Sequence, residues 1–161
     1  MLILLSTLMS QAAPPTAPTT YAAAQPQSKV QAILDGAVES AVSEFSWALR
    51  PMVRPKLAPL ATACPSYDVH IDGPAFRIQC KGKDPFEWTV GKSDAWTSPD
   101  GRQMTVTLRQ EGARFHLDFV GKEGGKTYIY DFAGDGLVVT QKIYADKLPS
   151  PMQWTLSYRT P

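Results

Sequence analysis

Between residues 67 and 158 apolar and polar residues alternate in short runs, and many of the apolar residues are aromatic. In the run 114–119, for example, Phe115, Leu117 and Phe119 alternate with polar neighbours. Successive side chains of a β-strand point to opposite faces, so each run predicts a strand with one apolar and one polar face. We therefore expect a mainly β fold whose strands turn their apolar faces toward one interior.

Short segments rich in glycine, proline and aspartate separate these runs. We expect strands at 67–72, 75–81, 86–91, 102–110, 114–121, 126–132, 137–145 and 153–160. Connections of this length force neighbouring strands to run antiparallel, because parallel strands need long crossovers. The prediction is an antiparallel meander of about eight strands, closed into a barrel because closure removes exposed edges.

Residues 1–27 predict a signal peptide followed by an unstructured leader. Residues 2–9 are almost wholly apolar and are followed by small residues, which is typical of a secretory signal, and the run is too short to span a bilayer. Residues 14–27 are rich in Pro, Thr, Ala and Gln and lack the means to bury a core. We expect an exported protein, periplasmic or secreted, whose folded domain comprises residues 28–161. The alternative is an unstructured apolar start in a cytosolic protein.

One amphipathic helix is predicted from Ser28 to Leu49. Ser28 and Gln31 fit a capping box, and apolar residues then recur at steps of three and four. This stripe consists of Val30, Ile33, Leu34, Ala37, Val38, Ala41, Val42, Phe45 and Leu49. The polar side carries acids rather than the Lys and Arg of a membrane-surface helix, so we expect the stripe to pack on the sheet. Pro51 should end or kink the helix, and 51–64 should be extended or broken into short turns.

The chain has two cysteines, Cys64 and Cys80. A tight turn at 72–75 would place Tyr67 opposite Cys80, with Cys64 a short step beyond, so we expect a disulfide between them. Disulfides are usual in exported proteins, and two free thiols are the alternative. A metal site is not expected, because the two Cys and two His have no recognisable ligand spacing.

Composition and motifs exclude several classes of function. With 16 basic and 15 acidic residues there is no electrostatic case for a nucleic-acid or anionic-membrane partner. No nucleophile elbow, Walker loop or dinucleotide fingerprint is present, so neither catalysis nor a cofactor is expected. His70 and His116 fall on polar faces and are interpreted as surface residues.

The predicted interior is large and aromatic, and tyrosines bring hydroxyl groups into it. A roomy apolar interior with a few polar groups is what a small-molecule site needs, and buried hydroxyls need partners. The candidate ligand-binding residues are Trp88, Met104, Phe115, Leu117, Phe119, Tyr128, Tyr130, Trp154 and Tyr158. The leading interpretation is a non-enzymatic protein that binds a small apolar, lipid-like molecule. Two alternatives stay open: a filled barrel that binds or inhibits a protein partner through its surface or a sheet edge, and a barrel enzyme whose acid or base is not evident.

The order of these segments resembles the cellular fatty-acid-binding proteins, which are related to lipocalins. The resemblance lies in 67–73, 76–80 and 86–91, in the turn 97–102, and in the late strands 125–128, 136–140 and 154–158, and it covers about the last 95 residues. It implies a ten-stranded barrel that holds fatty acids or other apolar ligands inside.

The chain departs from that family at three points. The family opens with a strand before its helices, where this chain has the Pro-rich leader. The family's closing Arg-x-Tyr grips the ligand carboxylate, but Leu156 takes the place of the Arg before Tyr158, and the second Arg falls at Tyr130. A buried carboxylate without a cation is costly, so a neutral or differently anchored ligand is expected. Family members are also cytosolic, whereas this chain is expected to be exported.

Overall fold

The alternating runs of the sequence form a single antiparallel sheet in a computed structural model that describes residues 13–161. The strands are β1 (Thr19–Ala23), β2 (Ser66–Asp72), β3 (Ala75–Cys80), β4 (Phe86–Thr89), β5 (Ser93–Thr97), β6 (Gln103–Glu111), β7 (Arg114–Val120), β8 (Gly124–Ala133), β9 (Gly136–Ala145) and β10 (Met152–Arg159). Two α-helices, α1 (Gln27–Ser43) and α2 (Arg50–Leu57), and the short 3₁₀ helix η1 (Ala58–Leu60) lie between β1 and β2.

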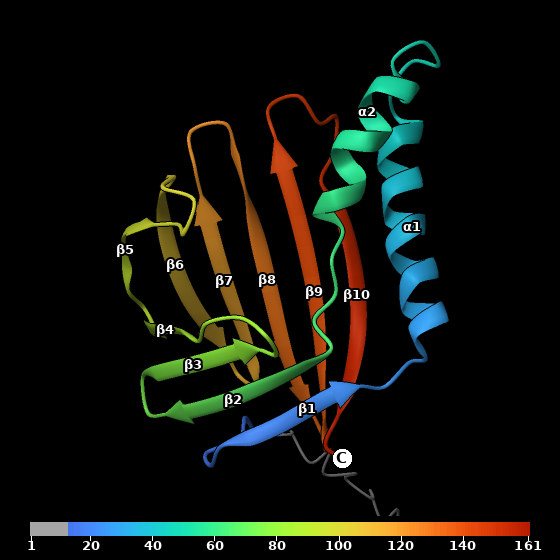
Figure 1. Cartoon of the computed structure of the whole chain (residues 1–161). Helices are drawn as coiled ribbons and strands as arrows, with labels where there is room; N and C mark the ends of the chain where they lie inside the picture. The colour runs from blue at the N-terminus through green and yellow to red at the C-terminus, as the bar shows by residue number, and fades with distance from the viewer. Residues whose placement is uncertain (1–12) are drawn as a thin grey trace, which may run out of the picture.

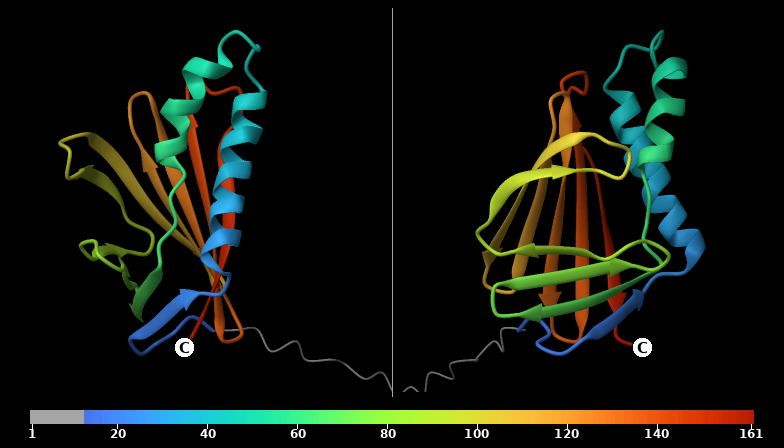
Figure 2. Two further views of the ribbon diagram at one scale, coloured as in Figure 1. Left: turned by 45° about the vertical axis from the view of Figure 1, so that its right-hand side comes forward. Right: turned by 60° about the vertical axis from the view of Figure 1, so that its left-hand side comes forward.

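The sheet curls into an incomplete barrel. Its strand order is β4-β3-β2-β1-β10-β9-β8-β7-β6-β5, so β4 and β5 are the two ends of the sheet and are not paired with each other. Figures 1 and 2 show β2 and β3 crossing over the long strands β7–β9, with the interior between these two layers. The mainly β, antiparallel prediction is confirmed, but the predicted full closure is wrong because the β4–β5 ladder is missing.

The sequence-based strand count was eight, and the structure has ten strands because β1 and β5 were missed. β1 lies inside the segment that we predicted to be unstructured, and it joins the two halves of the sheet by pairing with both β2 and β10. Its Tyr21 is buried and lies 5.8 Å from Phe132, measured between ring centroids. The leader prediction is therefore wrong for residues 19–23, and the signal-peptide prediction for 2–9 lies outside the described residues.

The predicted inward faces are confirmed across the eight expected strands. Phe115 and Trp154 are buried, while Trp88 and Tyr128 are half-buried and pack against the core. The main cluster joins residues of β1, β2, β3, β6, β7, β8, β9 and β10 to the inner face of α1. The interior is thus shared by the two layers of the curled sheet and the helix that lies beside them (Figure 2).

Helix α1 packs its apolar stripe against β10. Val30, Leu34, Ala37, Val38, Ala41 and Val42 are buried, as predicted. The capping box is not formed: the residue that precedes the helix is Pro26, and the Gln31 side chain donates instead to Asp35 Oδ1 at 2.8 Å. Leu49, predicted to belong to the stripe, lies beyond the end of α1 and is 47% exposed.

Pro51 begins a second helix rather than only ending the first. It lies in the first turn of α2, where a backbone N–H has no helical partner and proline is tolerated. Arg54 of α2 donates from Nε and from a terminal nitrogen to the two carboxylate oxygens of Glu39 in α1, at 2.6 and 2.9 Å. The prediction of an extended 51–64 segment is therefore wrong up to Leu60. Within residues 13–161 neither helix combines the length and the apolar character that a membrane span requires.

Candidate functional site

A cavity of about 240 Å³ lies inside the curled sheet. Side chains from both layers of the sheet line it, together with the segment Thr62–Cys64 that leads from η1 into β2. The lining residues are Thr62, Ala63, Cys64, Tyr67, Ile78, Cys80, Lys83, Asp84, Phe86, Trp96, Leu117, Phe119, Lys126, Tyr128, Tyr130 and Gln141. The cavity is therefore mainly apolar and aromatic, with a few polar groups, as in small-molecule sites.

Aromatic rings form most of the wall, and they contact one another. Tyr128 and Tyr130 are stacked along β8 with ring centroids 5.9 Å apart, and Tyr67 of β2 meets Tyr130 edge-on at 6.0 Å. At the other end of the cavity Phe119 lies 5.3 Å from both Phe86 and Trp96. Contacts of this kind hold the rings in fixed orientations, so the wall is preformed.

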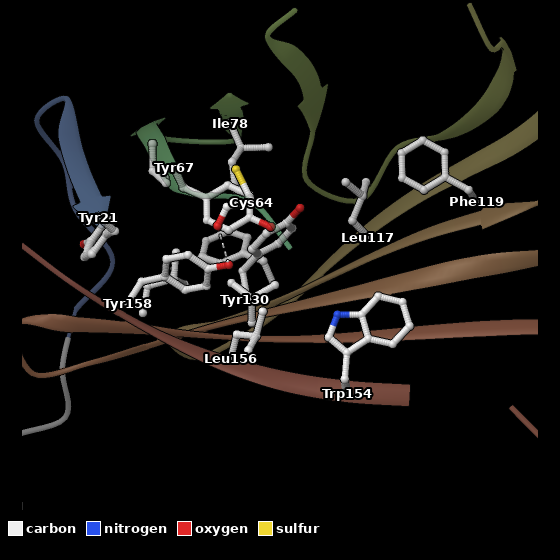
Figure 3. Packing of buried hydrophobic residues seen from close by; sticks show 14 of the residues in the cluster. Tyr21, Cys64, Tyr67, Ile78, Leu117, Phe119, Tyr130, Trp154, Leu156 and Tyr158 are labelled. Carbon is white, nitrogen blue, oxygen red and sulfur yellow. Dashed lines mark hydrogen bonds between the residues drawn. The ribbon is translucent and has the colours of Figure 1, made fainter. Parts of the chain in front are cut away.

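Two cavity tyrosines stay neutral over a wide pH range. Burial raises the pKa of Tyr130 well above its usual value, and burial followed by the neighbouring Tyr158 does the same to the pKa of Tyr67. Both hydroxyls are therefore protonated at neutral pH and can donate a hydrogen bond. Figure 3 shows the two residues side by side near Cys64.

The segment Thr62–Cys64 forms one wall and is fixed from the sheet side. The Trp154 indole N–H donates to the Thr62 carbonyl at 3.1 Å, and the Tyr158 hydroxyl donates to the Cys64 carbonyl at 2.9 Å (Figure 3). The Gln141 amide nitrogen lies 3.5 Å from the same Thr62 carbonyl, at the outer limit for a hydrogen bond. Burial raises the pKa of Tyr158 to about 12, so this donor also keeps its proton.

The predicted disulfide is present and closes the same wall. Cys64 is bonded to Cys80, with their Cα atoms 5.6 Å apart, and Tyr67 is paired with Cys80 as the turn at 72–75 predicted. The bond therefore ties the segment that follows the helices to the end of β3, and both half-cystines line the cavity.

Charged side chains gather at one part of the cavity. Lys83, Asp84 and Lys126 line it and are exposed, and we call the part that they line the mouth. The Lys126 ammonium lies 5.6 Å from the ring centroids of both Phe119 and Tyr128. By contrast, in the part of the chain that the structure describes no charged residue is buried, and Gln141 is the one buried polar residue.

Four of the nine predicted ligand-binding residues line the cavity: Leu117, Phe119, Tyr128 and Tyr130. Their role in binding stays a prediction. The other five lie elsewhere, as follows.

Trp154 and Tyr158 hold the Thr62–Cys64 wall from behind, and Phe115 fills the core against Phe76. Trp88 packs beside Phe86 and under the Lys92 ammonium, and Met104 is half-buried beside Gly121. Our selection of these five as cavity residues is not supported, because the position of 62–64 decides which inward residues are covered.

The sequence-based selection missed several residues that line the cavity. Tyr67, Gln141 and Lys126 all occupy inward positions of predicted strands, so the period-two pattern contained the signal. Only apolar and aromatic inward residues were selected, and the polar ones were passed over. Trp96 could not have been found in this way, because its strand β5 was missed.

The fold is similar to several solved structures. The fatty-acid-binding protein of Manduca sexta has a TM-score of 0.55 and 16% identity, with 91% of this chain and 100% of that one covered. Human cRBP IV has a TM-score of 0.54, 15% identity and coverages of 92% and 100%. An SAHS protein of Ramazzottius varieornatus has a TM-score of 0.56, 9% identity and coverages of 94% and 100%. The chain thus has the β-barrel fold of fatty-acid-binding proteins, and the predicted resemblance is confirmed at the level of the fold.

No protein-family model matches the chain, and no curated protein matches it in sequence.

Proposed function

We propose that this is an exported, non-enzymatic protein that binds a small apolar, lipid-like molecule in the interior of its β-barrel. The observation that carries the proposal is the cavity of about 240 Å³, walled by aromatic rings and provided with neutral hydroxyl donors at Tyr67 and Tyr130. Burial of apolar ligand surface against such a wall contributes about 25 cal/mol per Å². The fold supports the proposal, since two of the similar structures are a fatty-acid transporter and a fatty-acid-binding protein.

The size of the cavity limits what it encloses. Pockets for drug-sized ligands usually measure about 300–1,000 Å³, so this cavity encloses a smaller molecule or only part of a larger one. Because no charged residue is buried within residues 13–161, the enclosed part of the ligand is uncharged. An anionic group deep inside would lack a cation, which is costly.

Export is supported by the disulfide together with the apolar run at 2–9. A Cys64–Cys80 bond persists in oxidising compartments and is rare in the cytosol of mesophiles. Since β1 begins at Thr19, a signal peptide has to be removed before that residue to leave the sheet intact. Intact-mass measurement of protein purified from its own host is expected to show a mature chain that begins upstream of Thr19 and is two hydrogens lighter than its reduced form. A mature chain that still contains residues 1–9, with two alkylatable thiols, would contradict export.

A second candidate function is a protein-interaction module with a filled interior. The small cavity and the two unpaired sheet edges, β4 and β5, favour it, because an edge strand can pair with a strand from a partner. The two functions differ in whether the interior accepts a ligand.

Titration with the neutral fluorescent dye Nile red separates the two functions. The binding protein takes up one dye per chain, and an organic extract of the native host displaces it. Leu117→Trp places a larger side chain in the cavity wall and should block the dye with little loss of stability. Val120→Trp on the outward, exposed end of the same strand is the matched control and should bind as the wild type does.

In a filled interior, Leu117→Trp overpacks the core and costs about 1–3 kcal/mol. Absence of saturable dye uptake together with this loss would decide for the interaction module.

A further inference from the structure

The charge on the inner surface of this barrel is concentrated at the mouth of the cavity. Two lysines and one aspartate line the mouth, so its formal charge is positive, whereas the remaining lining residues are uncharged. An amphipathic ligand in this cavity would therefore meet apolar and neutral polar groups inside and cationic groups only where the cavity meets solvent.

Lys126 is part of the inner wall itself. It lies on the face of β8 that carries Tyr128 and Tyr130, and the register pairs it with Phe119 of β7 and Ile143 of β9. Its ammonium lies over the Phe119 and Tyr128 rings at 5.6 Å from each centroid. A cation at this distance is attracted to the ring faces, which keeps the charge above the cavity wall.

The charge of Lys126 has no carboxylate partner among residues 13–161. Arg54, Arg77, Lys92, Arg102, Arg109 and Arg114 all form ion pairs there, and Lys126 is not a member of any of them. Asp84, which shares the mouth, forms no ion pair within the described residues either, and it faces a net excess of positive charge. The ammonium is thus available to an anion at the mouth.

We propose that Lys126 binds the anionic head of an amphipathic ligand whose apolar tail occupies the cavity. The inference rests on the proposed ligand-binding function and adds the orientation of the ligand: tail inside, head at the solvent-exposed mouth. In this orientation no charge is buried, so the uncharged interior is compatible with an anionic ligand. Because the lysine is exposed, its ion pair with the head should strengthen binding about two- to fivefold.

The test compares three ligands with the same chain and different heads. Octyl sulfate, octanol and octyltrimethylammonium are titrated into the full-length protein by calorimetry, below their micellar concentrations, and inorganic sulfate is titrated as the head alone. We expect octyl sulfate to bind about two- to fivefold more tightly than octanol, octyltrimethylammonium to bind most weakly, and sulfate alone not to saturate. Lys126→Gln should remove the preference for octyl sulfate and leave octanol binding unchanged.

Two further variants serve as controls. Lys126→Arg keeps the charge and should keep the preference for the anion. Lys142→Gln makes the same charge change on the outward face of β9, where Lys142 is paired with Thr127, and should also keep the preference. Leu117→Trp should weaken all three octyl ligands together, because they share the cavity.

Each other outcome overturns the inference. Equal binding of the three ligands, or an anion preference that survives in Lys126→Gln, would overturn it while the proposed function stands. Saturable binding of sulfate alone would show an adventitious ion site only, without a role for the tail. No binding of any octyl ligand would overturn both the inference and the proposed function.

Discussion

The hydroxyl of Tyr158 in the last strand donates a 2.9 Å hydrogen bond to the backbone carbonyl of Cys64, 94 residues earlier in the chain. This bond holds the segment that leads from the helices into β2 against the inside of the sheet. Tyr158 is 1% exposed, so neither partner has water to replace the other. The position of this segment decides which inward side chains line the cavity and which are covered.

Tyr158→Phe should therefore destabilise the protein rather than change its ligand affinity. The substitution leaves the Cys64 carbonyl without its donor in the interior, which costs about 1–3 kcal/mol. Urea unfolding measures this loss, and Tyr128→Phe, at a half-buried ring whose hydroxyl forms no hydrogen bond within residues 13–161, is the matched control. A wild-type unfolding free energy in Tyr158→Phe would contradict the structural role of the bond.

The buried tyrosines should make the fold sensitive to alkaline pH. The pKa of Tyr158 is raised from 10.0 to about 12, and burial also raises the pKa of Tyr67 and Tyr130. Between pH 10 and about 12 the unfolded chain has lost these protons and the folded protein keeps them, so stability is full below pH 10 and falls as the pH rises. The expected fall is up to about 1.4 kcal/mol per pH unit for each such tyrosine.

Unfolding free energies on both sides of pH 10 provide the measurement. Tyr67→Phe should show a shallower fall with pH than the wild type, because one of the linked protons is gone. The exposed lysines titrate in the same range but are common to both proteins. Identical slopes would show that Tyr67 does not contribute to the linkage.

Reduction of Cys64–Cys80 should cost about 3 kcal/mol, as expected for a bond that closes a loop with a sequence separation of 16. The double variant Cys64→Ala with Cys80→Ala should match the reduced wild type in urea unfolding and should not respond to reductant. Because both half-cystines line the cavity, we also expect reduction to weaken Nile red binding. Equal stability with and without reductant would show that the bond does not constrain the chain.

Helix α1 should be required for stability. Val38 is 5% exposed, and Val38→Asp places an unpaired charge in the interface with the sheet, so we expect a loss of several kcal/mol. Ser40→Asp, on the exposed side of the same helix, is the control and should change stability little. If thermal unfolding of Val38→Asp has the wild-type midpoint, the helix does not pack as described.

The strands with regular alternation could be predicted from sequence, and those with one apolar residue could not. β1 buries only Tyr21 of its five residues and β5 half-buries only Trp96, so neither shows a period of two. β1 forms because β2 and β10 offer unpaired edges on either side of it, which is a long-range effect. The helix break before Pro51 was predicted, but the second helix was not, since proline is read as a terminator unless the first turn is considered.

The interior could be predicted as an inward face but not as a cavity. Phe115, Tyr130 and Trp154 share the inward direction, yet only Tyr130 lines the cavity. The difference depends on where residues 62–64 cross the sheet, and local pattern contains no information on that path. Lys126 and Gln141 were within reach of the sequence, because a polar residue at an inward strand position is itself a signal.

The central claim is that the interior of this barrel holds a ligand, and native mass spectrometry of protein purified from its own host tests it most directly. The account predicts a mass excess of one small molecule per chain, which is lost after organic extraction, absent from Leu117→Trp and retained in Val120→Trp. Wild-type protein that carries no such excess, and that gains none when it is incubated with Nile red or with an extract of the host, would contradict the account.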